Sequence, residues 1–292
     1  MKFKPIAVLI IFSLFLSGYV FAQDEAKDKQ AEEPKYGWQN EMIGGINLTQ
    51  TSFDNWAKGG ENSFAWQFNL NFKFINDQKK FNWANSGKFS YGSIKTGDEN
   101  IRKSIDEIKL ESVYTYKLGV YINPYVATTG ETQFAPGYDY NKKPKEQLSA
   151  FIDPAYFRES IGVGYQAKKI VKTRLGVAFK QTVTQSDDYP VNFADDPKTV
   201  ETENLKNEIG AESVTDVSWK ITNNTLFTSK LELFSNMKAF DEIDVNWDNV
   251  LTTKISKYFN VNLNFKLFYD KDISIKRQIK EAIALGFTYN FL

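Results

Sequence analysis

The side chains that most often carry out chemistry in enzymes are scarce in this chain. It contains no histidine and no cysteine, which excludes Ser–His and Cys–His catalysis, disulfides and the most common metal ligands. The pairs Asp187–Asp188 and Asp195–Asp196 could hold a hard cation such as Ca²⁺, although a solvated acidic loop explains them more simply. No phosphate-binding loop, dinucleotide-binding glycine pattern or EF-hand spacing occurs. We therefore predict no catalytic residue, no metal and no cofactor, and a protein that is not an enzyme.

A short cluster with a more specific pattern is Asn55-Trp56-Ala57-Lys58-Gly59-Gly60. Two adjacent glycines permit positive φ angles and close backbone approach, as in a tight hairpin. Trp56 could anchor the hairpin at the level of lipid headgroups or fold over the mouth of a barrel. We predict an architectural role for Asn55, Trp56, Gly59 and Gly60, with ligand binding as the alternative.

The segment 283–292 alternates strictly between large apolar and small or polar side chains. On a β-strand, this pattern places an apolar face opposite a small or polar one. Soluble proteins seldom expose such a strand, whereas a membrane barrel pairs it on both sides and turns its apolar face to lipid. By type and spacing, Gly286, Tyr289 and Phe291 resemble the C-terminal assembly signal of bacterial outer-membrane barrels. The resemblance implies insertion by the barrel-assembly machinery, with outer-membrane lipid as the surrounding partner.

The opposite end of the chain has the features of an export signal. Lys2 and Lys4 precede an apolar run at 6–16, and Val20-Phe21-Ala22 provides a signal-peptidase site. We predict a cleaved signal peptide at 1–22 and a flexible periplasmic leader at 23–36. The alternative is a membrane anchor, for which the apolar run is short. Residues 37–292 then form the barrel.

Alternating segments fill the rest of the chain. The clearest places aromatic or apolar side chains at every second position from Phe64 to Phe74, with Gln, Asn and Lys between them. A helix would scatter these aromatics around its axis. About twelve such segments (10–14) occur, joined by links that are alternately longer and shorter. The two longest links lie near 135–154 and 185–204. This rhythm is typical of a membrane barrel with short periplasmic turns and long outer loops. We predict an all-β, transmembrane, antiparallel up-and-down barrel, in preference to a soluble β-sandwich.

The face opposite the aromatic one must line the lumen. Lys and Arg together equal Asp and Glu, at 36 each, so no basic field suggests nucleic acid. The lumen charges are correspondingly mixed, and they either pair across the lumen and plug it or line a narrow aqueous path. The predicted lumen residues are Gln67, Asn69, Asn71, Lys73, Lys109, Glu111, Arg174, Lys180, Glu208, Glu212, Asp216, Glu232, Asp244, Asp248, Lys266, Lys276 and Lys280.

Three segments together resemble a known family. They are Asn-Trp-x-x-Gly-Gly at 55–60, Thr132-Gln133-Phe134 followed by Pro136-Gly137-Tyr138, and Asp153-Pro154-Ala155-Tyr156. The chain resembles the uncharacterised domain-of-unknown-function family 3078, predicted outer-membrane barrels of Bacteroidota. The resemblance implies a location in the cell envelope and a barrel fold, and it implies no biochemical activity.

These observations lead to three functional hypotheses. The first is a non-enzymatic, porin-like barrel for narrow passive passage or surface binding of a small solute, with the long loops as lids. The second is a structural barrel with a plugged lumen that contacts another envelope protein through 135–154. The third and weakest is an outer-membrane enzyme that uses loop carboxylates.

Overall fold

The computed structural model describes residues 36–54, 60–119, 121–167, 170–185, 189, 192–195, 200, 202–238, 242–271 and 276–292. The predicted signal peptide and the leader up to residue 35 lie outside this part of the chain. No helix among the described residues is long and apolar enough to cross a membrane.

The described residues form fourteen strands. Their bounds are β1 Gly37–Thr51, β2 Ser63–Asp77, β3 Phe81–Thr96, β4 Arg102–Tyr116, β5 Asn123–Thr132, β6 Gly137–Asp139, β7 Glu146–Ser149, β8 Ala155–Ala167, β9 Val171–Val183, β10 Leu205–Lys220, β11 Thr225–Asn236, β12 Ile243–Lys254, β13 Phe259–Tyr269 and β14 Gln278–Asn290.

Twelve of these strands close into a barrel in the order β1-β14-β13-β12-β11-β10-β9-β8-β5-β4-β3-β2. Every pair along the ring is antiparallel, and each strand pairs with its neighbours in the chain. The remaining two strands, β6 and β7, form a separate hairpin within the link between β5 and β8. The prediction of an up-and-down barrel of about twelve strands is therefore confirmed. The small hairpin was not predicted.

The strand links differ at the two ends of the barrel. At the end that also carries Gly37 and Asn290, they span 78–80, 117–122, 168–170, 221–224 and 255–258. We call this the turn end. The opposite, loop end carries the links 52–62, 97–101, 133–154, 184–204, 237–242 and 270–277. The two long links that the sequence predicted lie together at the loop end.

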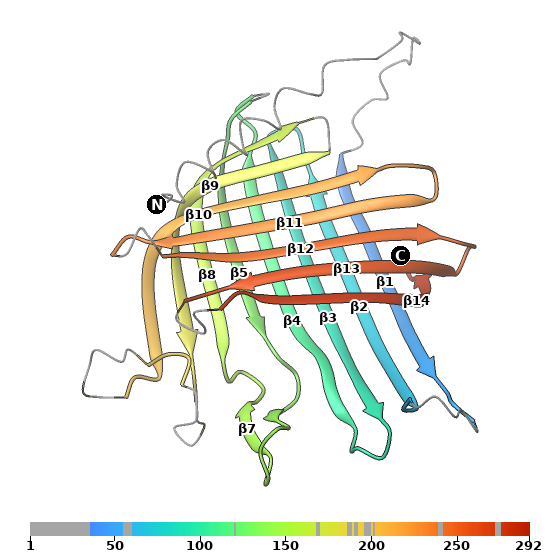
Figure 1. Ribbon diagram of the computed structural model, residues 1–292. Coiled ribbons are helices and arrows are strands. Elements are labelled where there is room, and N and C mark those ends of the chain that lie inside the picture. The colour runs from blue at the N-terminus through green and yellow to red at the C-terminus, as the bar shows by residue number, and fades with distance from the viewer. Residues whose placement is uncertain are drawn as a thin grey trace, which may run out of the picture. The chain divides into compact units, whose positions relative to one another are not determined.

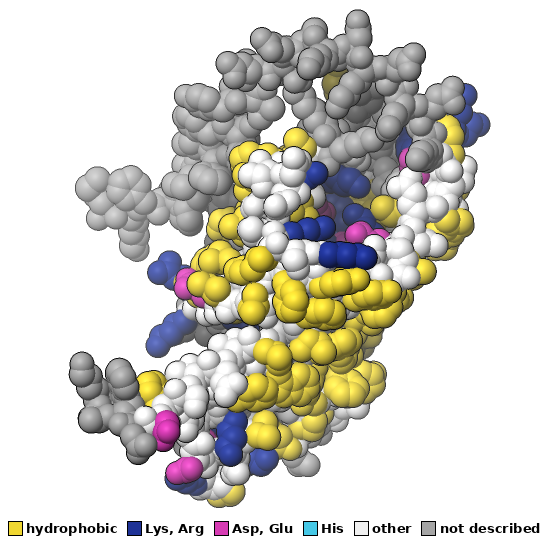
Figure 2. Space-filling model, turned by 90° about the vertical axis from the view of Figure 1, so that its right-hand side faces the viewer, with side chains coloured by type: hydrophobic (Ala, Val, Ile, Leu, Met, Phe, Trp, Pro, Cys, Tyr) yellow, Lys and Arg dark blue, Asp and Glu magenta, His cyan; other side chains and the backbone are white. Residues whose placement is uncertain are grey.

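The barrel reverses the usual distribution of polar and apolar side chains. Ile161 and Ile283 on its outer face are 64% and 70% exposed, whereas Glu212 and Lys180 in its lumen are 2% and 5% exposed. Figure 2 shows hydrophobic side chains gathered in a broad band on one face of the molecule. Exposing so many apolar side chains to water is unfavourable, whereas contact with the hydrocarbon chains of lipid carries no such cost. The fold is that of a transmembrane barrel.

The barrel is strongly sheared. In Figure 1, β11 to β14 pass in front of β1 to β4 at a steep angle. The lumen side chains of these two runs of strands therefore face one another across a short distance, and this arrangement determines the chemistry of the interior.

Candidate functional site

The lumen carries the polar side chains that the alternating pattern predicted. Gln67, Asn69 and Asn71 of β2 line the interior, as do Lys266 of β13 and Lys280 of β14. Lys276 does not, because β14 begins at Gln278 and Lys276 lies exposed in the link before it. The strand periodicity does not extend back to that residue.

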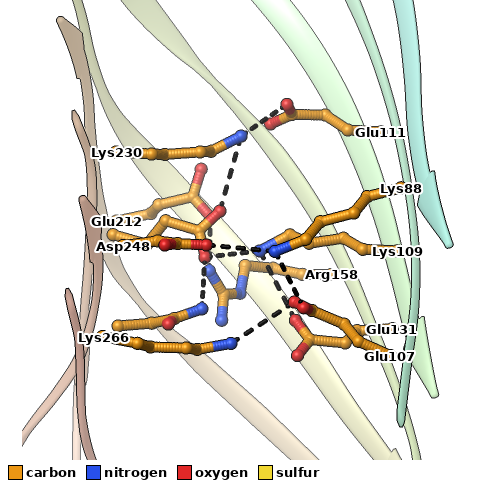
Figure 3. Close-up of polar contacts among 12 residues, drawn as sticks. Lys88, Glu107, Lys109, Glu111, Glu131, Arg158, Glu212, Lys230, Asp248 and Lys266 are labelled. Atoms are coloured by element: carbon orange, nitrogen blue, oxygen red, sulfur yellow. Dashed lines mark hydrogen bonds and ion pairs between the residues drawn. The ribbon is translucent and has the colours of Figure 1, made fainter. Parts of the chain in front are cut away.

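Ion pairs connect opposite walls of the barrel. Lys88 Nζ of β3 lies 2.9 Å from Glu107 Oε2 of β4 and 3.1 Å from Asp248 Oδ2 of β12. Lys266 Nζ of β13 lies 3.3 Å from Glu107 Oε1. We call Lys88, Glu107, Asp248 and Lys266 the quartet. Between β3 and β13 the ring contains β2, β1 and β14, so these contacts cross the lumen, as Figure 3 shows.

A second group continues the quartet along the lumen. Lys109 Nζ lies 2.7 Å from Glu232 Oε2 and 3.4 Å from Glu131 Oε2. Glu111 lies 2.6 Å from both Lys230 Nζ and Arg174 Nη2. Together with Arg158, which contacts Glu212 at 3.3 Å, this group and the quartet form what we call the ionic bridge.

Several charges of the ionic bridge contact more than one partner. Glu232, 5% exposed, accepts hydrogen bonds from Lys109 and from Asn246 Nδ2 at 2.9 Å. Glu212 accepts a further hydrogen bond from Ser160 Oγ at 2.9 Å. Desolvating a charge is costly, and only good geometry with additional hydrogen bonds offsets that cost. Glu232 and Glu212 meet this condition, whereas the Nε atoms of Arg158 and Arg174 are buried without a hydrogen-bond partner among the described residues.

A separate cluster lies nearer the loop end. Lys180 Nζ lies 2.7 Å from Asp244 Oδ2, 3.1 Å from Asp270 Oδ2 and 3.5 Å from Glu208 Oε2. Its ammonium group also lies 5.3 Å from the ring centre of the buried Phe234. Three carboxylates around one lysine hold β9, β10, β12 and the link after β13 together.

On the other side of the ionic bridge, the lumen stays open as a cavity of about 1090 Å³. We call this cavity the amide compartment, because eleven of its lining residues are Asn or Gln. Its walls come mainly from β1, β2, β4, β12, β13 and β14. They include Asn223 and Asn224 at the turn end, and Gln133 and Ser149 at the loop end. The compartment thus reaches both ends of the barrel.

The charges in the lining of the compartment balance. Five are acidic and five are basic, and the quartet supplies two of each. The formal charges of the lining therefore sum to zero. The four quartet residues pair with one another, while Asp106 pairs with Lys103 and Glu131 with Lys109, and neither of these two lysines lines the compartment. The ten residues are Glu41, Asp106, Glu107, Glu131, Asp248, Lys88, Lys220, Lys254, Lys266 and Lys280.

Hydrogen bonds fix the orientation of several amides. Thr252 Oγ1 donates to Asn262 Oδ1 at 2.9 Å, and Asn262 Nδ2 donates to Asn260 Oδ1 at 2.6 Å. Asn260 Nδ2 in turn donates to Thr288 Oγ1 at 2.9 Å. This relay runs across β12, β13 and β14. On the facing wall, Asn69 Oδ1 accepts from Gln67 Nε2 at 2.6 Å and from Ser90 Oγ at 2.9 Å.

Gly286 of the predicted assembly signal lies where the relay meets β1. A Cβ atom at this position would lie 2.6 Å from Oδ1 of both Asn47 and Asn260. Only glycine leaves room for these amides. Tyr289 and Phe291 lie on the outer face, with ring centres 5.1 Å apart, and Phe291, one residue past β14, donates its backbone N–H to Met42 O at 2.8 Å. These positions are consistent with the predicted assembly signal, which stays a prediction.

The motif around residues 55–60 lies mostly outside the described part of the chain, including Asn55, Trp56 and Gly59. Gly60 is described and has a φ of 137°. A Cβ atom there would lie 2.6 Å from the ring of Phe53. The backbone of Phe53 donates to Asn62 Oδ1 at 2.6 Å. Gly60 thus has a backbone conformation that residues with a side chain rarely adopt, and the role of the motif stays a prediction.

The two later motif segments are hydrogen-bonded to each other. Thr132 Oγ1 donates to Pro154 O at 3.0 Å, and Gln133 Nε2 donates to Asp153 O at 3.1 Å. Ser149 Oγ completes the contact by donating to Gln133 Oε1 at 3.0 Å. These bonds bring the two ends of the link 133–154 together at the mouth of the barrel.

Asp106 of β4 holds the start of this link. Its carboxylate accepts from the backbone N–H of Phe134 at 2.7 Å and of Ala135 at 2.8 Å. Lys103 Nζ lies 2.9 Å from the same carboxylate and donates to Ala135 O at 2.7 Å. The link is therefore held against β4 by a buried ion pair.

The predicted acidic pairs provide no described metal site. Asp187, Asp188 and Asp196 lie outside the described residues, and only Asp195 is within them. Within the described ranges, no group of three or more acidic side chains is placed to hold a metal ion.

Sequence reasoning missed several members of the ionic bridge, namely Lys88, Glu107, Glu131, Arg158 and Lys230. The signal was present: Lys88 immediately precedes the outward-facing Phe89, and Arg158 follows the outward-facing Phe157. Extending the alternation through each strand would have placed all five in the lumen.

Comparisons with known proteins found one family and several solved structures. A family described as "Protein of unknown function (DUF3078)" matches residues 48–138. No curated protein sequence matches the chain. The translocator domain of the autotransporter NalP from Neisseria meningitidis is 8% identical, with 88% of this chain and 90% of that chain covered and a TM-score of 0.41.

Two further solved structures are similar. An outer membrane channel from Pseudomonas putida F1 is 12% identical, with 91% of this chain and 99% of that chain covered and a TM-score of 0.40. The NanC porin is 10% identical, with 86% of this chain and 100% of that chain covered and a TM-score of 0.40. At these identities the likeness concerns the fold alone. The family match spans the first two of the three motif segments, and the predicted resemblance to this family is confirmed over residues 48–138.

Proposed function

We propose that this protein is a non-enzymatic barrel of the bacterial outer membrane through which a small solute passes passively. The observation that carries the proposal is the amide compartment, whose lining includes residues at both the turn end and the loop end. A polar cavity that reaches both ends of the barrel is expected of a passage and is not expected of a plugged barrel. The apolar outer face supports a surrounding of outer-membrane lipid, and the C-terminal strand supports insertion by the barrel-assembly machinery.

The ionic bridge limits the size of this passage. It crosses the lumen between β3–β4 and β12–β13, so only the part on its β1, β2 and β14 side stays open. The passage is therefore narrower than an empty barrel of twelve strands, and the link 133–154 lies at its mouth. The compartment, at about 1090 Å³, is of the order of pockets that bind small molecules, so a small solute fits inside it.

Conductance in planar lipid bilayers tests the proposal. The purified, folded barrel is expected to give small, reproducible unitary steps in potassium chloride. A variant with both Lys88→Met and Asp248→Leu removes one contact that crosses the lumen and is expected to give larger steps. If neither protein opens at any voltage, and liposomes containing them do not swell in small solutes, the proposal is wrong.

The second candidate is a structural barrel with a plugged lumen that partners another envelope protein through residues 135–154. The ionic bridge favours it, because its twelve charged side chains span the interior and pair with one another. A barrel of this kind would show no conductance, and cross-linking from the β6–β7 hairpin in whole cells would yield one discrete adduct.

A further inference from the structure

The lining of the amide compartment differs in kind from the rest of the lumen. The packed side holds the ionic bridge and the Lys180 cluster, whose charged side chains form ion pairs. The open side holds eleven Asn and Gln residues, and its five acidic and five basic side chains cancel. A solute in the compartment therefore meets an array of neutral amides together with charged side chains whose charges sum to zero.

Neutral amides select for a particular kind of ligand. A side-chain amide offers an acceptor oxygen and two donor N–H groups, so it pairs well with a group that both donates and accepts. Hydroxyl groups have this property, whereas carboxylates and phosphates only accept and ammonium groups only donate. A charged solute would also lose its hydration without gaining an opposite net charge in the lining.

The amides are held in place before any solute arrives. The relay from Thr252 through Asn262 and Asn260 to Thr288 fixes one wall, and the hydrogen bonds of Gln67 and Ser90 to Asn69 fix the facing one. Ordering these side chains therefore costs a bound solute little entropy. Tyr156, Phe193 and Phe268 add apolar surface to the lining toward the loop end, where the C–H face of a sugar ring could rest.

We infer that the amide compartment passes uncharged, polyhydroxylated solutes of the size of simple sugars in preference to charged ones. This inference rests on the proposed passage and specifies its substrate class.

Liposome swelling with three matched solutes tests the inference. Glucose, gluconate and glucosamine have similar size and differ in charge. We expect glucose to enter at least about fivefold faster than either charged solute, the effect expected when a charge is transferred into a neutral lining. Equal rates for all three would overturn the substrate class and leave the passage itself intact. No entry of any solute would instead overturn the proposed function.

A matched pair of variants locates the selectivity. Asn69→Asp adds a charge to the lining, and the new carboxylate can still accept from Gln67 and Ser90. Asn207→Asp makes the same change on the outer face of β10, where Asn207 Oδ1 accepts from Gln181 Nε2 at 3.2 Å. We expect Asn69→Asp to lower the ratio of glucose to glucosamine entry by about fivefold and Asn207→Asp to leave it unchanged.

Heat-modifiable migration on a gel confirms beforehand that both variants are folded. If the folded Asn69→Asp variant keeps the wild-type ratio, Asn69 does not line the path and the inference is wrong. The same conclusion follows if Asn207→Asp changes the ratio as much as Asn69→Asp does.

Discussion

Neutralising one carboxylate of the ionic bridge tests whether the bridge stabilises the barrel. Glu232 is 5% exposed and accepts from Lys109 Nζ at 2.7 Å and from Asn246 Nδ2 at 2.9 Å. Lys230 Nζ lies 3.6 Å away. The substitution Glu232→Gln keeps the size of the side chain and removes its charge. Lys109 then keeps only Glu131, at 3.4 Å, while Lys230 keeps Glu111.

The expected loss follows from this geometry. Removing one partner of a buried ion pair usually costs about 3–5 kcal/mol, because the other charge stays buried without compensation. Both lysines retain a second carboxylate here, so we expect a loss of about 3 kcal/mol, at the lower end of that range. In the double variant Lys109→Met/Glu232→Gln the stranded ammonium is gone, and stability should return to within about 1 kcal/mol of wild type.

Urea titration of the folded barrel in lipid vesicles, followed by tryptophan fluorescence, measures these differences. Glu99→Gln is the matched control. Glu99 pairs with Arg102 at 2.9 Å in an exposed link, where losing an ion pair costs less than about 1 kcal/mol. The reasoning is refuted if Glu232→Gln unfolds at the same urea concentration as Glu99→Gln. It is also refuted if the double variant is less stable than Glu232→Gln alone.

Three further predictions follow from the glycines and the loop-end ion pair. Gly286→Val should destabilise the closed barrel by about 1–3 kcal/mol through overpacking against Asn260, and a shift of the heat-modifiable band to lower temperature checks this. Asp106→Asn should weaken two charge-assisted hydrogen bonds and the pair with Lys103, each worth about 1.5–3 kcal/mol; faster proteolysis within the long link that it holds, with an unchanged barrel core, is the expected result. Gly60→Ala should cost about 1–3 kcal/mol because of its positive φ; if the surviving folded protein also fails to pass solute, the motif is a binding site and its architectural interpretation is wrong.

The strands could be predicted because their signal is local. A residue such as Phe68 or Asn69 faces outward or inward according to its position in a repeat of two, and only its close neighbours in sequence are needed to see this. The strand at 283–291 could be predicted for the same reason, since strong alternation identifies a strand regardless of what it pairs with. The β6–β7 hairpin was missed because short strands within a link have too few residues to show alternation.

The contacts across the lumen could not be predicted in the same way. Lys109 was placed in the lumen from its alternation, but its partner Glu232 lies 123 positions away, and Lys88 and Asp248 are 160 positions apart. Which lumen side chains meet depends on the tilt and stagger of the strands, and these are properties of the whole ring. The two alternatives of a plugged lumen and an open path were both left open, and the structure contains a part of each.

The closing seam explains why the plugged and open parts occupy different sides. The strands richest in inward-facing Asn are β2 near the start of the barrel, with Asn69 and Asn71, and β13 near its end, with Asn260 and Asn262. They are far apart in the chain and become near neighbours only because β1 pairs with β14. The amide compartment therefore forms when the barrel closes, and Gly286 lies at that junction with Asn47, Asn260 and Asn262 around it. Gly286, a residue of the predicted assembly signal, thus also leaves room for the amides of β1 and β13 at the closing seam, which links closure of the barrel to the chemistry of the lumen.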